Sequence, residues 1–385
     1  MTMTTSPAAA GELTVAAVRS RLRDWLSANA DNLGSFCELP TDVDGVFDTL
    51  SRLQHLLYAA GWIRLGWPEE LGGLGGSVAL RGVVCEELAA AGYPPPFSFG
   101  TQEVLGPAIV KYADPQLART VLPRLLGGEE TWCQGFSEPG AGSDLGSLRT
   151  RAVEDDDGFH ITGEKLWTSW AQYANRCLLL VRTGTQEEAH RGITALFIDM
   201  DTPGITVSPL RAMTGEAEFC SMFFDDVVVK KDRVLGKIGG GWRVAMFVLS
   251  CERGVAAWQR QAWMHWRLDR LIRDAPSLSD ARAGEALELI HALRLLSRRT
   301  LRAFSSGEVL GSRSSWDKLA SSTAEKFLFD SAFEALPDEI AFGEDRSAID
   351  WRNDFLYSRA SSIYGGAAEI QRNIIAEHLL GLPRD

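Results

Sequence analysis

The spacing of apolar residues changes twice along this 385-residue chain, and that change limits the fold more than any single motif does. Before about residue 130 the apolar positions recur every three to four residues, as at Val15, Val18 and Leu22, which predicts amphipathic helices. From about 174 to 229, short apolar and β-branched runs replace this pattern and predict strands. Helical spacing returns near Gly239 and continues to the end. We therefore expect three domains in the order α, β, α.

We place the domain boundaries where the pattern changes. The predicted domains are a helical domain at residues 1–130, a β domain at 131–234 and a helical domain at 235–385. The predicted helices of the first domain cover 13–30, 47–60, 77–91, 101–111 and 115–126, and a glycine-rich loop covers 61–76. The predicted strands cover 159–164, 174–183, 193–198, 205–209 and 219–229, with turns expected at 163–164, 203–204 and 225–226. One loop at 342–350 is expected to interrupt the C-terminal helices.

The composition excludes several classes of function. A net charge of −12 argues against nucleic-acid binding, because proteins of that class present basic faces. No run approaches the roughly 18 apolar residues of a membrane span. Residues 1–11 lack the basic and apolar regions of a secretory signal, so we predict a frayed tail there. Six dispersed cysteines without a CxxC pair are typical of reduced thiols in a cytoplasmic protein, and the six histidines show no metal-ligand spacing.

Two neighbouring segments carry residue types that suit a large flat ligand. In residues 135–144, Gly140 and Gly142 let backbone N–H groups approach a ligand without an intervening Cβ. Residues 163–170 place an indole beside two small hydroxyls, which suits a flat polar ring system. The side chains expected to line that ligand are Ser137, Ser143, Trp167, Thr168 and Ser169. Glycine and serine content alone also fits a surface turn followed by a β-hairpin.

The complete strings are more specific than their composition. Glu-Pro-Gly-Ala-Gly-Ser-Asp at 138–144, followed by Gly-Glu-Lys-Leu-Trp at 163–167, resembles the flavin segment of the acyl-CoA dehydrogenases. The resemblance extends over essentially the whole chain. It implies a three-domain α+β fold with a middle β-barrel or sandwich domain and a C-terminal four-helix bundle. It also implies FAD as cofactor, bound through Gln134, Phe136, Ser137, Ser143, Trp167, Thr168, Ser169 and Glu369, although Phe136 replaces the usual aliphatic residue.

The family removes a proton from its substrate with a glutamate at one of two positions. The commoner position lies in a C-terminal Tyr-Glu-Gly-Thr loop, where this chain has Tyr364-Gly365-Gly366-Ala367, and glycine cannot abstract a proton. The second position lies on the first helix of the C-terminal domain. There Glu252-Arg253 resembles the Glu-Arg pair of members that use that site. The resemblance therefore implies Glu252 as the catalytic base.

Helix geometry supports the same residue independently. The neighbours of Glu252 three and four positions away are all apolar, namely Val248, Leu249, Val255 and Ala256. A carboxylate on such a face is desolvated, which raises its pKa toward the range useful for a general base. The alternative is a structural glutamate paired with a basic group from another helix. Ser143 and Arg253 are expected to contact the substrate. For Arg253 the alternative of a purely structural role remains open.

Two family segments are missing from this chain. Most members carry Arg-x-x-Phe-Gly after that helix, reaching into the neighbouring subunit's FAD, whereas residues 263–276 contain no such run. Residues 342–351 likewise replace the usual Gln-x-x-Gly-Gly-x-Gly. This pattern, and the tail at 369–384, resemble one subunit of the α2β2 acyl-CoA dehydrogenases that bacteria use on steroid-derived CoA thioesters. The resemblance implies a second, acyl-CoA dehydrogenase-like subunit; the alternative is a homotetramer that binds FAD through other groups.

The implied activity is α,β-desaturation of an acyl-CoA, with electrons passed to an electron-transfer flavoprotein. Two alternatives share the fold: a flavin oxidase or monooxygenase that reacts with O₂, and a non-catalytic structural subunit of a mixed oligomer. A base at Glu252 favours dehydrogenation, because the monooxygenases need no α-proton abstraction. The sequence does not define the acyl group. Gly365 leaves space near the acyl chain, which fits a bulky or ring-bearing substrate.

Overall fold

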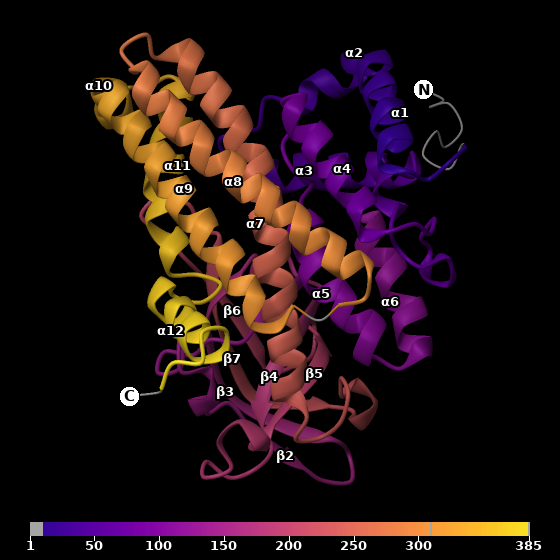
Figure 1. Cartoon of the computed structure of the whole chain (residues 1–385). Helices are drawn as coiled ribbons and strands as arrows, with labels where there is room; N and C mark the ends of the chain where they lie inside the picture. Colours follow the sequence, from indigo (N-terminus) through magenta and orange to yellow (C-terminus); the bar gives the residue numbers. More distant parts are fainter. Residues whose placement is uncertain (1–10, 309, 384–385) are drawn as a thin grey trace.

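The polypeptide forms three consecutive blocks around one long central helix, α7 (Gly241–Asp274), as Figure 1 shows. The computed structural model describes residues 11–308 and 310–383, so nearly all of the predicted N-terminal tail lies outside the described residues. Helix α7 packs against α4 and α5 of the first block, strand β5 of the second and α8 and α9 of the third. The side chains of α7 therefore face all three blocks.

The first block contains the helices that the sequence predicts. Its main helices are α1 (Val15–Ala28), α3 (Val43–Ala59), α4 (Val78–Ala90), α5 (Phe99–Tyr112) and α6 (Pro115–Gly127), with a short α2 (Ala30–Leu33). Asp42 begins α3 by accepting a hydrogen bond from the backbone N–H of Gly45, and Asp114 begins α6 in the same way. The glycine-rich loop at 61–76 contains only two short 3₁₀ turns, as expected of a segment with five glycines at positive φ.

The second block is a seven-stranded mixed sheet. Its strands are β1 (Trp132–Gly135), β2 (Arg151–Glu154), β3 (Phe159–Ser169), β4 (Arg176–Arg182), β5 (Ile193–Asp199), β6 (Ile205–Leu210) and β7 (Phe219–Val229). Their order is β1-β4-β2-β3-β7-β6, and β5 pairs with β4. Strand β4 runs parallel to β1 and β2, while the other pairs are antiparallel.

Two predicted turns are absent from this sheet. Strand β3 continues through Gly163 to Ser169, with register shifts against β7 on both sides of Lys165. A Cβ on Gly163 would lie 2.7 Å from Cα of Thr150, so this glycine permits close backbone approach rather than a hairpin turn. Asp226, at φ 52°, is likewise an irregularity inside β7 and not its end.

The third block consists of helices, but their breaks differ from the prediction. The helices after α7 are α8 (Asp280–Ser305), α9 (Ser314–Ala335), α10 (Pro337–Phe342), α11 (Arg346–Ser358) and α12 (Ala368–His378). The loop predicted at 342–350 shrinks to 343–345, because Asp345 caps α11 through the backbone N–H of Ala348. A further break follows α7, where Pro276 cannot continue a helix and Ser279 begins α8.

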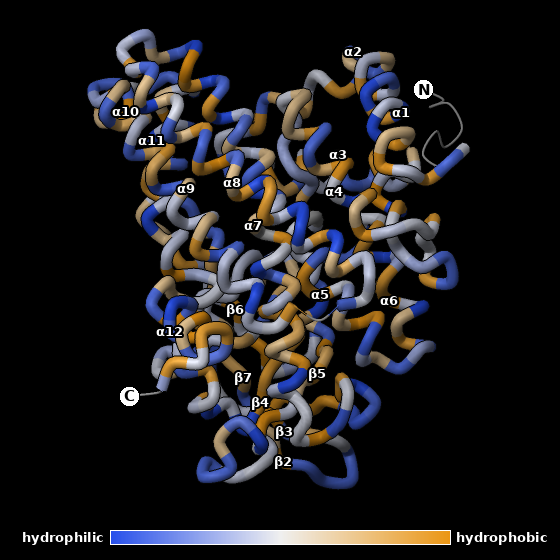
Figure 2. Tube along the Cα trace, in the orientation of Figure 1, coloured by the Kyte–Doolittle hydropathy of each residue, from blue (hydrophilic) through white to orange (hydrophobic). Residues whose placement is uncertain are grey.

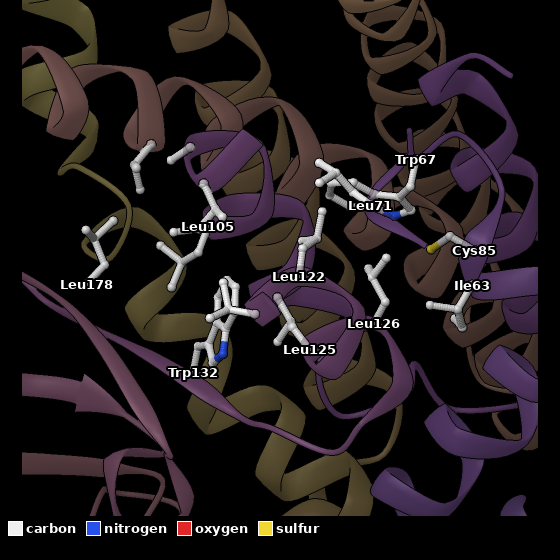
Figure 3. Packing of buried hydrophobic residues seen from close by; sticks show 14 of the residues in the cluster. Ile63, Trp67, Leu71, Cys85, Leu105, Leu122, Leu125, Leu126, Trp132 and Leu178 are labelled. Carbon is white, nitrogen blue, oxygen red and sulfur yellow. The ribbon is translucent and has the colours of Figure 1, made fainter. Parts of the chain in front are cut away.

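A single hydrophobic cluster joins the first two blocks. Trp132 of β1 lies beside Leu122 and Leu125 of α6, and Leu178 of β4 belongs to the same cluster on the side of Leu105, as Figure 3 shows. A separate cluster fills the C-terminal helices and contains Leu268, Leu328 and Trp351. Along the trace in Figure 2, hydrophilic residues predominate on the outermost loops and helix faces. Within the described residues, no helix combines the length and apolar character needed to cross a bilayer.

Candidate active site

The two segments that resemble a flavin site lie side by side. The backbone N–H of Leu166 donates to the carbonyl oxygen of Ser137 over 2.9 Å. The Lys165 ammonium donates to the carbonyl oxygen of Phe136 over 3.2 Å. These bonds join the turn after β1 to the end of β3, so the two predicted flavin segments are direct neighbours.

A buried ion pair holds this junction in place. Lys165 is fully buried, and its ammonium lies 2.8 Å from Oε1 of Glu138. Glu138 also accepts hydrogen bonds from the backbone N–H groups of Arg149 and Thr150. Burial acts to raise the pKa of Glu138, but the ammonium and these bonds outweigh it and leave the pKa below its ordinary value. Burial lowers the pKa of Lys165 to about 8. This pair was not predicted from the sequence, although Glu138 and Lys165 belong to the two flavin motifs.

The end of β3 presents an aromatic ring to the outside. The register shift between Lys165 and Thr168 places Trp167 at φ 62°, and its side chain is 58% exposed. Thr168 instead points inward, and its buried Oγ1 has no hydrogen-bond partner among the described residues. A buried hydroxyl without a partner requires an explanation, and a ligand that hydrogen-bonds there supplies one. An exposed indole beside it fits a flat ring that carries polar atoms.

The glycine-rich turn leaves the adjoining surface open. A Cβ on Gly140 or Gly142 would meet no atom of this chain within 4 Å, and neither residue has a positive φ. These glycines are therefore not needed for the turn itself, which agrees with a role in admitting a ligand. Ser143 and Ser169 are exposed, and Ser137 is partly buried. The open turn, the exposed indole and the buried hydroxyl together fit the FAD that the sequence implies.

Glu252 lies on α7 next to this region. The Gln134 side chain, in β1, is near enough to act on the pKa of its carboxylate, so the predicted base and the flavin segment are neighbours. Burial raises the pKa of Glu252, and the lowering effects of Lys318, Arg253 and Gln134 only partly oppose it. Gln134, predicted as a cofactor contact, therefore also positions the carboxylate.

The C-terminal loop reaches the same point. Gly365 adopts φ 63°, and a Cβ placed on it would lie 3.1 Å from Oε1 of Glu252. It would also lie 3.7 Å from Nζ of Lys318. The two positions at which the family can carry a glutamate thus converge in this chain, with the carboxylate supplied by the helix and the glycine by the loop.

Two other predicted site residues have different surroundings. Arg253 is almost completely buried, and its Nη1 lies 3.5 Å from Oγ of Ser314 on α9, so its described contact is within the helical bundle. Glu369 is 77% exposed on α12 and faces Arg372, 3.5 Å away on the same helix. Neither contact joins these two side chains to Glu252 or to the flavin segments.

Lys318 was not identified from the sequence. It lies on α9, is 6% exposed, and its ammonium donates to the carbonyl oxygen of Ser361 over 2.7 Å. The same ammonium lies 4.0 Å from the centre of the Tyr364 ring. Burial lowers the pKa of Lys318 to about 8. No motif surrounds this lysine, and a lysine on the buried face of a predicted helix is the only signal that the sequence offers.

Comparison with known proteins identifies the family. Residues 39–129, 133–227 and 239–380 match the models for the N-terminal, middle and C-terminal domains of acyl-CoA dehydrogenases. Over 383 residues the chain is 37% identical to acyl-CoA dehydrogenase IpdE1 of Mycobacterium tuberculosis, an alignment that spans 95% of this chain and 97% of that protein. The chain therefore belongs to the acyl-CoA dehydrogenase family, whose members are oxidoreductases.

Two solved structures extend the similarity to the whole fold. The Tcur3481-Tcur3483 steroid ACAD matches with a TM-score of 0.83 and 26% identity, over 98% of this chain and 100% of that chain. The ChsE4-ChsE5 complex from Mycobacterium tuberculosis matches with a TM-score of 0.78 and 26% identity, over 98% and 99% of the two chains. The predicted three-domain fold and the resemblance to the steroid subgroup are confirmed.

Proposed function

We propose that this chain catalyses the FAD-dependent α,β-desaturation of an acyl-CoA thioester. The observation that carries the proposal is the position of Glu252, a partly buried carboxylate that contacts Gln134 of the flavin segment and faces Gly365. A carboxylate with a raised pKa in such a place suits general base catalysis. Because only the ionised form accepts a proton, the rate should rise with pH through the pKa of Glu252.

The cofactor would be held by the two joined segments. The contributing side chains are Gln134, Phe136, Ser137, Ser143, Trp167, Thr168 and Ser169. A bound flavin supplies the acceptor for the hydride that leaves the β-carbon. The combined variant Trp167→Ala, Ser143→Ala should be purified with little flavin, because it loses the exposed ring and one hydroxyl of the open face. Full flavin occupancy in that variant would contradict the assignment.

The protein's own residues would handle the proton. Glu252 removes it from the α-carbon, Gln134 holds the carboxylate in place, and the space beside Gly365 admits the acyl chain. We include Ser143 as a substrate contact. We assign Arg253 no contact with the substrate, because the side chain that it contacts is Ser314. It remains the neighbour of Glu252 in the chain.

The proposed assembly is an α2β2 heterotetramer in the cytoplasm. The absence of both FAD-donating segments from the sequence supports it, as does the similarity to two complexes named for two different chains. We propose a bulky or steroid-derived acyl group and an electron-transfer flavoprotein as acceptor. A homotetramer has less support because both of these segments are missing. A flavin oxidase or monooxygenase and a non-catalytic subunit have less support because Glu252 and the flavin segments are retained.

One experiment separates these possibilities. The protein is purified alone and with its genomic neighbour, its flavin spectrum is recorded, and straight, branched and steroid CoA thioesters are added without air. Anaerobic bleaching by one thioester class supports the dehydrogenase and identifies the acyl group. A colourless protein in both preparations contradicts it and favours a structural subunit. A homotetramer with four tightly bound FAD and full activity would refute the need for a partner.

A further inference from the structure

A buried lysine from α9 shares the space beside the proposed base. Nζ of Lys318 and Oε1 of Glu252 both lie within 4 Å of the point where a Cβ on Gly365 would stand, at 3.7 and 3.1 Å. The two groups come from different helices, α7 and α9. The two charged atoms are therefore less than about 7 Å apart, and opposite charges that close in a desolvated site attract each other because little water screens them.

The anchors of Lys318 are not carboxylates. Its ammonium donates to the carbonyl oxygen of Ser361 and lies 4.0 Å from the centre of the Tyr364 ring. A lysine ammonium has three donors, and neither anchor neutralises its charge. Lys165, by contrast, lies 2.8 Å from a carboxylate oxygen of Glu138. The charge of Lys318 therefore remains able to act on Glu252.

The other charges near this pair are largely occupied elsewhere. The further charged or titratable groups near it are Arg253 and Arg260 of α7, Glu325 of α9 and Tyr364 of the C-terminal loop, and Tyr364 is in turn near Glu218 before β7. Arg260 donates to both carboxylate oxygens of Glu325, so these two charges compensate each other. Among the charged groups, Lys318 has the largest lowering effect on the pKa of Glu252, ahead of Arg253.

We propose that Lys318 is a positioning residue for the base: anchored by Ser361 and Tyr364, its ammonium holds the Glu252 carboxylate in its charged form beside Gly365. This inference deepens the proposed function and rests on it for its catalytic meaning. It explains what favours the ionised form of a carboxylate that lies on an apolar helix face. It also assigns a purpose to a buried lysine that forms no direct ion pair with Glu252 in the described structure.

The test removes the charge but keeps a donor for Ser361. Lys318→Gln, Lys318→Met and Lys318→Arg are prepared as flavin-loaded protein, with its partner subunit if one is required. Lys326→Met is the matched control, because it removes a lysine from the same helix about two turns away. The ionisation of Glu252 is followed by infrared spectroscopy between pH 5 and pH 9, as the carboxyl band that disappears in Glu252→Gln.

In Lys318→Gln we expect the midpoint of that band to rise by at least about one pH unit, which corresponds to about a tenfold change in the ionisation equilibrium. Lys318→Arg should restore the midpoint to within about half a unit, and Lys326→Met should leave it unchanged. The acid limb of substrate-dependent flavin reduction should move with the band. An unchanged midpoint in folded Lys318→Gln or Lys318→Met overturns the inference, as does a shift of equal size in Lys326→Met.

The same data separate this inference from the proposed function. A shifted carboxyl band in Lys318→Gln, together with an active Glu252→Gln enzyme, would refute Glu252 as the base while supporting the electrostatic role of Lys318. A purely structural role predicts lower thermal stability in Lys318→Met and Lys318→Gln without any movement of the band, and that result overturns the inference.

Discussion

Among the described residues, Lys165 lies near Glu138 and Lys318 lies near Glu252, and the two arrangements differ in how lysine and glutamate meet. Lys165 contacts Glu138 directly at 2.8 Å, and two backbone N–H groups complete the coordination of that carboxylate. Lys318 instead bonds Ser361 and acts on Glu252 across the space beside Gly365. The pKa of each lysine is lowered to about 8 by burial, yet the pKa of Glu138 falls and that of Glu252 rises.

The difference shows what direct contact contributes. A carboxylate that receives an ion pair and several hydrogen bonds is held in its charged form and has little remaining affinity for a proton. A carboxylate whose cation is more distant keeps a pKa above its ordinary value and therefore a greater affinity for a proton. The first arrangement suits a structural joint between two segments, whereas the second suits a base. Burial alone does not distinguish them, because both lysines are buried.

The largest expected effect comes from removing the proposed base. Glu252→Gln is nearly isosteric, so the protein should fold and retain flavin while losing proton abstraction. General base catalysis contributes roughly 10²–10⁴-fold, and we expect a loss at or above the upper end, because Gly365 offers no substitute. Rapid-mixing measurements of anaerobic flavin reduction with the true substrate check this. Reduction within a few-fold of the wild-type rate would refute the role of Glu252.

The second effect compares the two lysines in stability. Lys165→Met leaves Glu138 buried without its partner, and breaking a buried pair in this way costs about 3–5 kcal/mol. Lys318→Met should cost less, because Lys318 makes no direct carboxylate contact and loses mainly the bond to Ser361. Urea unfolding of both variants gives the comparison, and Glu138→Gln in the Lys165→Met background should recover part of the loss. Equal losses from the two lysine variants would contradict the distinction drawn between the pairs.

A smaller effect is expected at the gap beside the base. Gly365→Ala places a Cβ at φ 63°, a backbone conformation that costs a residue other than glycine about 1–2 kcal/mol, and only 3.1 Å from Oε1 of Glu252. We expect a loss of stability of about that size. We also expect bulky thioesters to reduce the flavin more slowly than in the wild-type protein. Gly284→Ala on α8 is the control, since its Cβ would meet no atom within 4 Å. If Gly365→Ala changes neither the stability nor the reaction with bulky thioesters, the space beside Gly365 does not determine which acyl groups the site accepts.

The sequence predicted the segments that depend on local pattern. Apolar neighbours at helical spacing placed Glu252 on a buried face, and the two glycine-rich strings identified the segments that Leu166 and Ser137 join. Contacts between distant segments were not predictable in this way. Lys318 reaches the base only through the packing of α9 on α7, and the turn expected at Gly163 became close contact with Thr150. Helix breaks were misjudged because single capping residues such as Asp345 fixed them.

The most direct test of Glu252 isolates proton removal from electron transfer. The flavin is first reduced chemically, so that hydride transfer from the substrate is blocked, and the enzyme is incubated with its acyl-CoA in deuterated water. Mass spectrometry then follows deuterium entering the α-carbon. We predict exchange by the wild-type enzyme and at least a hundredfold slower exchange by Glu252→Gln, in line with the roughly 10²–10⁴-fold contribution of a general base. Exchange at the wild-type rate in Glu252→Gln would contradict the assignment of this carboxylate as the base.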